Sequence, residues 1–135
     1  MFKLSSPGPV VMVDDNAGDL FFVERCYLAS NLGNPWLPFS RGTDFLDHLE
    51  RAKSGQAPIP ALVLLDLNMP GMTGLEILQT TRADPFFAEV PIFVVLTSST
   101  DPRDKRRAED LGVDGFYTKT SNLDQYIAFF NAMVP

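Results

Sequence analysis

The chain is poor in the residues that build disulfides, zinc centres and histidine-based active sites. Its 135 residues include one cysteine and one histidine. A single cysteine excludes an intrachain disulfide, and with a single histidine it supplies no zinc cluster. Cys26 is predicted to be buried in a helix among apolar neighbours. His48 is predicted to lie at the surface, far in the chain from other reactive residues, so it gives no basis for nucleophilic-triad chemistry.

The sequence also lacks a long apolar run and an excess of positive charge. No apolar stretch approaches the roughly 20 residues of a membrane-spanning helix, and residues 1–5 do not form a signal-peptide core. The net charge is −6, from 11 basic and 17 acidic residues, which argues against a sequence-independent grip on nucleic acid. We therefore expect a cytoplasmic protein that binds neither membranes nor nucleic acid.

What is present is a pattern of short apolar runs separated by amphipathic segments. Apolar runs bounded by turn residues predict buried parallel strands near 9–13, 61–66, 91–97 and 115–118, and a proline-flanked edge strand near 36–40. Helical periodicity predicts helices over 17–32, 43–53, 74–82, 101–111 and 122–133. Five strands alternating with five helices predict an α/β fold in a single domain of residues 1–135, a flavodoxin-like (βα)5 doubly wound parallel sheet with strand order 2-1-3-4-5.

Local signals mark the ends of two of these helices. Asp101 is placed to cap the fourth helix, with Pro102 in its first turn, and Gly112 is placed to stop it. Thr43 or Asp44 is expected to cap the second helix.

Polar side chains stand at or near the ends of four predicted strands. Asp14 and Asp15 follow the first strand, Asp66 follows the third, Thr97 ends the fourth and Lys119 follows the fifth. In an open parallel sheet, ligands bind beyond the carboxyl ends of the strands, where the strand order reverses. We therefore expect the three aspartates to converge in one crevice. Carboxylates packed so closely repel one another and invite a divalent cation.

These residue types in this order suit phosphoryl transfer. Mg²⁺ uses one or two carboxylates and leaves a position for a phosphate oxygen. The backbone carbonyl of Asn68 would complete the protein ligands. An ionised Asp66 beside the ion is a candidate nucleophile that forms an aspartyl phosphate, with the Thr97 hydroxyl and the Lys119 ammonium on phosphoryl oxygens. Singly, each residue has a plain structural interpretation, such as a helix cap; the complete set in chain order does not.

The segments that hold these residues resemble the receiver domain of two-component response regulators. They are Val13 to Asn16, the run Asp66-Leu-Asn-Met-Pro-Gly, the run Thr97-Ser-Ser and the run Gly115 to Lys119. The resemblance covers about residues 8–132. It implies Asp66 as phosphoacceptor, Asp14 and Asp15 as acidic Mg²⁺ residues, Asn68 as a carbonyl ligand, Thr97 as switch hydroxyl and Lys119 as phosphate-facing lysine.

The chain departs from the family pattern at three places. Thr120 follows the lysine where the family usually has a proline, so this loop is expected to be less rigid. Phe116 takes the aromatic switch position that is usually tyrosine. The stretch 54–60 is longer than usual. With the Lys-Thr-Ser-Asn-Leu tail, this pattern is similar to the single-domain regulators of bacterial phytochrome histidine kinases.

The resemblance implies a stand-alone switch and not an enzyme. A sensor histidine kinase would donate a phosphoryl group to Asp66, Thr97 would move inward, and Phe116 would fill the space that Thr97 leaves. A phosphorelay intermediate that serves a histidine phosphotransfer protein remains an alternative, as does a pseudo-receiver scaffold. A haloacid dehalogenase type of phosphatase needs a second aspartate where Asn68 stands.

The last helix carries more apolar residues than one buried face needs. Leu123, Ile127 and Phe130 suffice to cover the sheet. Tyr126, Phe129 and Met133 then widen the apolar surface, and we expect them to form a homodimer interface.

Overall fold

The computed structural model describes residues 3–135 as one parallel sheet covered by helices. The strands are β1 (Val10–Val13), β2 (Trp36–Phe39), β3 (Leu62–Leu65), β4 (Ile92–Thr97) and β5 (Gly115–Thr118). The helices are α1 (Ala17–Leu28), α2 (Gly42–Lys53), α3 (Gly74–Ala83), α4 (Pro102–Asp110) and α5 (Leu123–Asn131). All strand pairs are parallel, in the order β2-β1-β3-β4-β5. The predicted fold class and strand order are confirmed.

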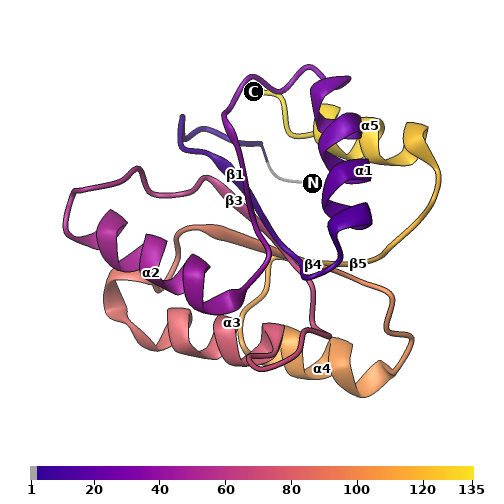
Figure 1. Ribbon diagram of the computed structural model, residues 1–135. Coiled ribbons are helices and arrows are strands. Elements are labelled where there is room, and N and C mark those ends of the chain that lie inside the picture. Colours follow the sequence, from indigo (N-terminus) through magenta and orange to yellow (C-terminus); the bar gives the residue numbers. More distant parts are fainter. Residues whose placement is uncertain (1–2) are drawn as a thin grey trace.

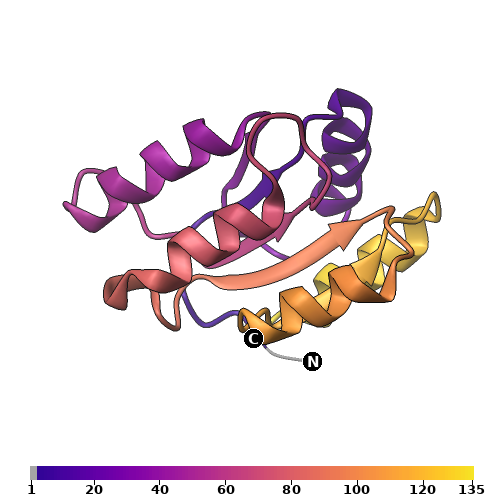
Figure 2. The same cartoon turned by 90° about the horizontal axis from the view of Figure 1, so that it is seen from below.

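The helices form one layer on each face of the sheet. Figure 1 shows α1 and α5 together on one face and α2, α3 and α4 on the other. Seen from below, α3 and α4 lie in front of the sheet and run beside β4 (Figure 2). Because both faces are covered, β1 and β3 are apolar at every position and fully buried. β2, with Pro38, is an edge strand as predicted. No helix within residues 3–135 is long and apolar enough to span a membrane.

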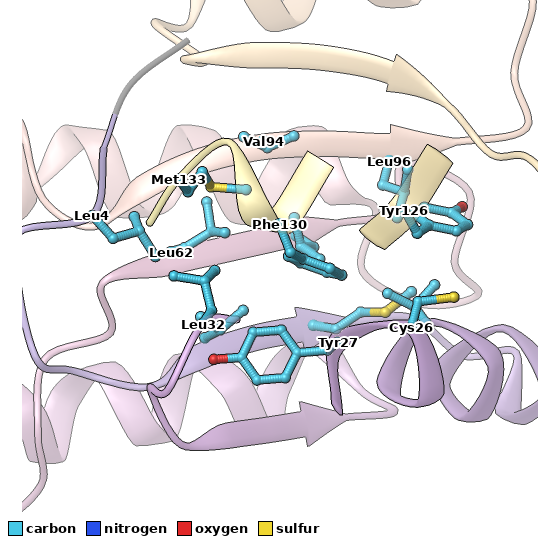
Figure 3. Close-up of a cluster of buried hydrophobic side chains, with 14 of the residues drawn as sticks. Leu4, Cys26, Tyr27, Leu32, Leu62, Val94, Leu96, Tyr126, Phe130 and Met133 are labelled. Atoms are coloured by element: carbon cyan, nitrogen blue, oxygen red, sulfur yellow. The ribbon is translucent and has the colours of Figure 1, made fainter. Parts of the chain in front are cut away.

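The core between the sheet and α1 and α5 corrects our prediction for the last helix. Figure 3 shows Tyr126, Phe130 and Met133 within this buried cluster. Tyr126 is 5% exposed and Met133 is fully buried, so neither presents an apolar surface, while Leu123 is 45% exposed. Helical spacing allowed two apolar stripes on this segment, and docking of α5 against α1 selects the one at 126, 130 and 133. Phe129 is half-buried.

His48 is likewise buried and not at the surface. It is 4% exposed, on the face of α2 that also buries Phe45 and Leu49. Its ring packs 5.5 Å from the ring of Phe39, and its Nε2 lies 3.3 Å from the carbonyl oxygen of Pro58. The long 54–60 segment folds back over this part of α2 and shields His48 from solvent. The sequence of the helix alone does not predict this contact. Cys26 is buried, as predicted.

The helix ends agree with the sequence where a cap is unambiguous. Asp101 caps α4 by accepting a 2.9 Å hydrogen bond from the Arg103 amide, and Gly112 follows the helix with φ +83°. The predicted caps of α2 are wrong, because the helix begins at Gly42 with Arg41 as N-cap and has no side-chain cap. α1 ends at Leu28 and not, as predicted, near residue 32. Just beyond its end, the Ser30 hydroxyl donates a hydrogen bond to the carbonyl oxygen of Tyr27.

Candidate functional site

The strand register brings the predicted acidic residues together at the carboxyl edge of the sheet. Val13 pairs with Leu65 across β1 and β3, so the next residues, Asp14 and Asp66, emerge side by side. Asp14, Asp15 and Asp66 each offer a carboxylate oxygen, and these oxygens all lie within 4.8 Å of one another. Asp14 is fully buried and Asp66 is 5% exposed, whereas Asp15 is open to solvent.

Backbone amides fix one oxygen of each buried carboxylate. The Asn16 amide donates to Asp14 Oδ1 at 2.9 Å, and the Asn68 amide donates to Asp66 Oδ1 at 3.4 Å. Asn16 also caps α1, accepting a 3.0 Å hydrogen bond from the Asp19 amide. The loops that follow β1 and β3 therefore orient the carboxylates before any ligand arrives.

Lys119 joins the acidic group from β5. Its Nζ lies 2.7 Å from Asp14 Oδ2, 2.8 Å from Asp19 Oδ2 and 3.4 Å from Asp66 Oδ2. Its backbone amide donates to the Thr97 carbonyl at 2.8 Å, which continues the pairing of β4 with β5. The backbone pairing thus fixes the position of the Lys119 main chain, and the carboxylates fix the position of its ammonium group.

Burial and charge act in opposite directions on the ionisable groups. Burial lowers the pKa of Lys119, but its contacts with Asp14 and Asp19 outweigh burial and raise this pKa above its usual range. Burial raises the pKa of Asp14, against the effects of Lys119 and the Asn16 amide. Lys119 is therefore charged at neutral pH, and the effect of burial on the pKa of Asp14 is only partly offset by Lys119 and the Asn16 amide.

The donor set fits a hard divalent cation. Asp14, Asp15 and Asp66 supply only carboxylate oxygens, the ligands that such ions prefer. Asp14 Oδ2 is buried, and its ion-pair partner is Lys119 Nζ at 2.7 Å. One ammonium does not neutralise these carboxylates, and a divalent cation would supply the missing positive charge. The expected carbonyl ligand, Asn68, is an exposed residue in the loop after Asp66.

Thr97 and Phe116, the predicted switch residues, lie on the neighbouring strands β4 and β5. Thr97 is fully buried, and its Oγ1 accepts a 3.2 Å hydrogen bond from the Ser99 amide. The Ser99 hydroxyl donates to Asp104 at 2.6 Å, which ties this loop to α4. Phe116 is half-buried and packs against a small cluster centred on Val95.

Two residues contact the site although neither was predicted to do so, and Tyr126 was instead predicted to lie in a homodimer interface. Asp19 bonds to Lys119 from the first turn of α1, where an acidic residue is ordinarily explained by the helix dipole. Tyr126 accepts a 3.3 Å hydrogen bond from the backbone amide of Thr120. A proline at position 120 would have no such amide, so Tyr126 braces the loop that the usual proline would stiffen.

Fold and site together define a class: a flavodoxin-like domain with an acidic group, a hydroxyl and a lysine at the switch point of its sheet. Residues 10–131 match the family described as "Response regulator receiver domain". This protein belongs to the response regulator receiver family. Receiver domains are regulatory phosphoacceptors that interact with sensor histidine kinases.

The chain is similar to response regulators of phytochrome systems. It is 29% identical over 118 residues to response regulator Rcp1 of Synechocystis, covering 87% of this chain and 80% of Rcp1. The crystal structure of Mn²⁺-bound Rcp1 has a TM-score of 0.80 and 26% identity, covering 93% of this chain and 91% of the other. The phosphorylated cyanobacterial phytochrome response regulator RcpA has a TM-score of 0.80 and 27% identity, covering 93% and 89%.

Proposed function

We propose that this protein accepts a phosphoryl group on Asp66 from a sensor histidine kinase, with Mg²⁺ bound, and signals through altered protein binding. The observation that carries the proposal is the convergence of three carboxylate oxygens within 4.8 Å beside Lys119. In the proposed mechanism Asp66 is the nucleophile, the three carboxylates are the cation site, and Lys119 brings a positive charge close to both. Phosphoryl transfer needs little more than such positioning and charge compensation.

Each site residue has a role in the proposed transfer. An Asp66 carboxylate oxygen attacks the phosphorus of a phosphohistidine; a P–O bond forms, the P–N bond breaks, and the imidazole leaves and takes up a proton. Lys119 compensates charge on the phosphoryl oxygens. Asp14, Asp15, Asp66 and the Asn68 carbonyl hold Mg²⁺, which supplies further positive charge at those oxygens when bound.

The proposed switch begins with a movement of the Thr97 side chain toward the phosphoryl group. The Thr97 hydroxyl oxygen accepts a hydrogen bond from the Ser99 amide, so its own proton is free to donate to a phosphoryl oxygen, and the inward movement of the hydroxyl would pull on the Ser99 contact. The β4–α4 loop then shifts with Ser99 and Asp104, and Phe116 fills the vacated space. Such a change is a shift between two packings of α4, β5 and α5.

We further propose a phytochrome-type kinase as partner, because RcpA is by name a cyanobacterial phytochrome response regulator. Onward transfer to a histidine phosphotransfer protein uses the same chemistry in reverse. Mixing the phosphorylated protein with such a partner and following the label would distinguish a relay from a terminal switch.

The first test of the proposed function is Mg²⁺-dependent phosphorylation. The protein is incubated with acetyl phosphate and Mg²⁺, and its intact mass is compared with that of Asp66→Asn. We expect a single phosphoryl adduct on the wild type, none on Asp66→Asn, and none after chelation of Mg²⁺. If the wild type forms no adduct and does not bind beryllofluoride, the protein is instead a scaffold of the pseudo-receiver type.

A further inference from the structure

Asp19 contacts the site lysine from outside the candidate cation site. Its Oδ2 accepts a 2.8 Å hydrogen bond from Lys119 Nζ. Asp19 does not belong to the group of Asp14, Asp15 and Asp66 whose oxygens converge. Its side chain is 39% exposed, against 0% for Asp14 and 6% for Asp66. The contact therefore joins the first turn of α1 to the loop after β5 at the solvent-facing side of the site.

The ammonium of Lys119 has as many N–H groups as it has carboxylate neighbours. A lysine has three N–H donors, and Asp14, Asp19 and Asp66 lie 2.7, 2.8 and 3.4 Å from Nζ. A phosphoryl group on Asp66 adds acceptor oxygens that the lysine can reach only by giving up one of these contacts. Of the two neighbours that stay free carboxylates, Asp19 is partly solvated and Asp14 is buried, so water replaces the Asp19 bond at the lower cost.

We propose that Asp19 is a positioning residue that restrains Lys119 in the unphosphorylated protein, and that phosphoryl capture exchanges the Lys119–Asp19 bond for a bond to a phosphoryl oxygen. This inference rests on the proposed role of Asp66 as phosphoacceptor. The exchange leaves the Asp19 carboxylate without its partner at the surface of α1. The first turn of α1 thereby senses whether Asp66 is occupied.

The test compares Asp19→Asn with Asp124→Asn. Both substitutions remove one negative charge from the first turn of a helix, but Asp124 is exposed on α5 and lies outside the site. Beryllofluoride, a phosphoryl mimic, is titrated at saturating Mg²⁺ and followed by ¹⁹F NMR. We expect Asp19→Asn to tighten beryllofluoride binding about two- to fivefold, the range for loss of a partly exposed ion pair, and Asp124→Asn to leave it unchanged.

A second measurement reports the contact without any phosphoryl mimic. The ¹³C shift of the Lys119 ε-carbon, assigned through its loss in Lys119→Met, is recorded in metal-free protein. We expect it to change in Asp19→Asn and to stay at the wild-type value in Asp124→Asn. A role limited to helix stability would not move this signal.

The outcomes separate the two proposals. If the wild type does not bind beryllofluoride, the proposed function fails and this inference fails with it. If the wild type binds and Asp19→Asn binds equally or more weakly, only the role of Asp19 is overturned. Equal tightening of beryllofluoride binding in Asp124→Asn would also overturn it, since the effect would then come from the change in net charge. An unchanged Lys119 ¹³C shift in Asp19→Asn would overturn it as well, since Asp19 would then not contact the lysine.

Discussion

Asp15 is the one member of the acidic group that is open to solvent. Asp14 and Asp66 are buried and held by backbone amides, so their substitution disturbs the surrounding structure as well as the cation site. Asp15 has no such structural role, and its substitution reports on cation binding alone. Buried members of the acidic group therefore support the structure of the site as well as the cation, whereas the exposed Asp15 is expected to act on the cation alone.

We expect Mg²⁺ to stabilise the wild type and to stabilise Asp15→Asn much less. A ligand that binds only the folded protein adds about 2.7 kcal/mol to the free energy of unfolding at 100 times its Kd. The melting temperature of both proteins is measured with and without MgCl₂, and NaCl of equal ionic strength is the control. An equal gain in Asp15→Asn would place the cation elsewhere.

A second prediction at the residue scale concerns His48 and the pH dependence of the free energy of unfolding. Burial lowers the pKa of His48 below its ordinary value of 6.5. The unfolded chain therefore takes up a proton at a higher pH than the folded protein does. Its contribution to stability is complete above about pH 6.5 and is lost as the pH falls from there through the lowered folded pKa.

We therefore expect the free energy of unfolding of the wild type to fall between pH 7.5 and pH 5. In His48→Gln, which cannot titrate, this fall should be smaller. Urea denaturation at a series of pH values measures both curves. Parallel curves for the two proteins would show that His48 is not responsible.

At the scale of the elements, the loop between β3 and α3 depends on a close approach of two backbones. A Cβ at Gly74 would lie 2.2 Å from the carbonyl oxygen of Asp66, and neither backbone can yield as a flexible side chain would. Gly74 begins α3 after a capping box formed by Thr73 and Glu76. The start of this helix and the position of Asp66 are therefore fixed together.

Gly74→Ala is expected to lower the free energy of unfolding by about 1–3 kcal/mol, as overpacking does, and to slow phosphorylation of Asp66. Gly33→Ala is the matched control, because a Cβ there meets nothing within 4 Å. Urea denaturation and the intact-mass assay give the two readouts. A Gly74→Ala protein as stable and reactive as Gly33→Ala would contradict this account.

A second prediction at this scale concerns Tyr126, which joins α5 to the loop that carries Lys119. In Tyr126→Phe the ring stays in the core, but the Thr120 amide loses its hydrogen-bond partner. We expect a loss of about 1 kcal/mol in the free energy of unfolding and faster amide hydrogen exchange at residues 119–122. Unchanged exchange there would mean that the loop does not depend on Tyr126.

At the scale of the whole molecule, the open question is self-association. The residues first expected to form a homodimer interface are largely buried, but Tyr117 and Leu123 are 40% and 45% exposed, and the Tyr117 ring packs 5.2 Å from that of Phe129. Tyr117 lies on β5 and Leu123 on α5, two of the elements that the proposed switch repacks. The homodimer therefore stays a prediction, with a changed set of residues.

We expect a dimer at micromolar concentration that Leu123→Glu converts to a monomer. Leu28→Glu changes a leucine that is 67% exposed on α1 and should have no such effect. Size-exclusion chromatography with light scattering measures the mass of each protein. A monomeric wild type at all concentrations, with and without beryllofluoride, would exclude the dimer.

The sequence by itself determined the alternation of strands and helices, the sheet as the class of fold, and the set Asp14, Asp15, Asp66, Thr97 and Lys119. These follow from local signals: the length of an apolar run, a cap or a glycine at a helix end, and a polar residue directly after a buried strand. Once the strands are parallel, their carboxyl ends meet at one edge, so residues far apart in the chain converge.

Only the tertiary structure decided which stripe of α5 is buried, that His48 is covered, and that Asp19 reaches Lys119. Each of these depends on how segments distant in the chain dock against one another. The face of α5 is set by α1, the cover of His48 by the 54–60 loop, and the Asp19 contact spans 100 residues. Local patterns contain no information on such distances, because burial and ion pairing arise only when the layers pack together.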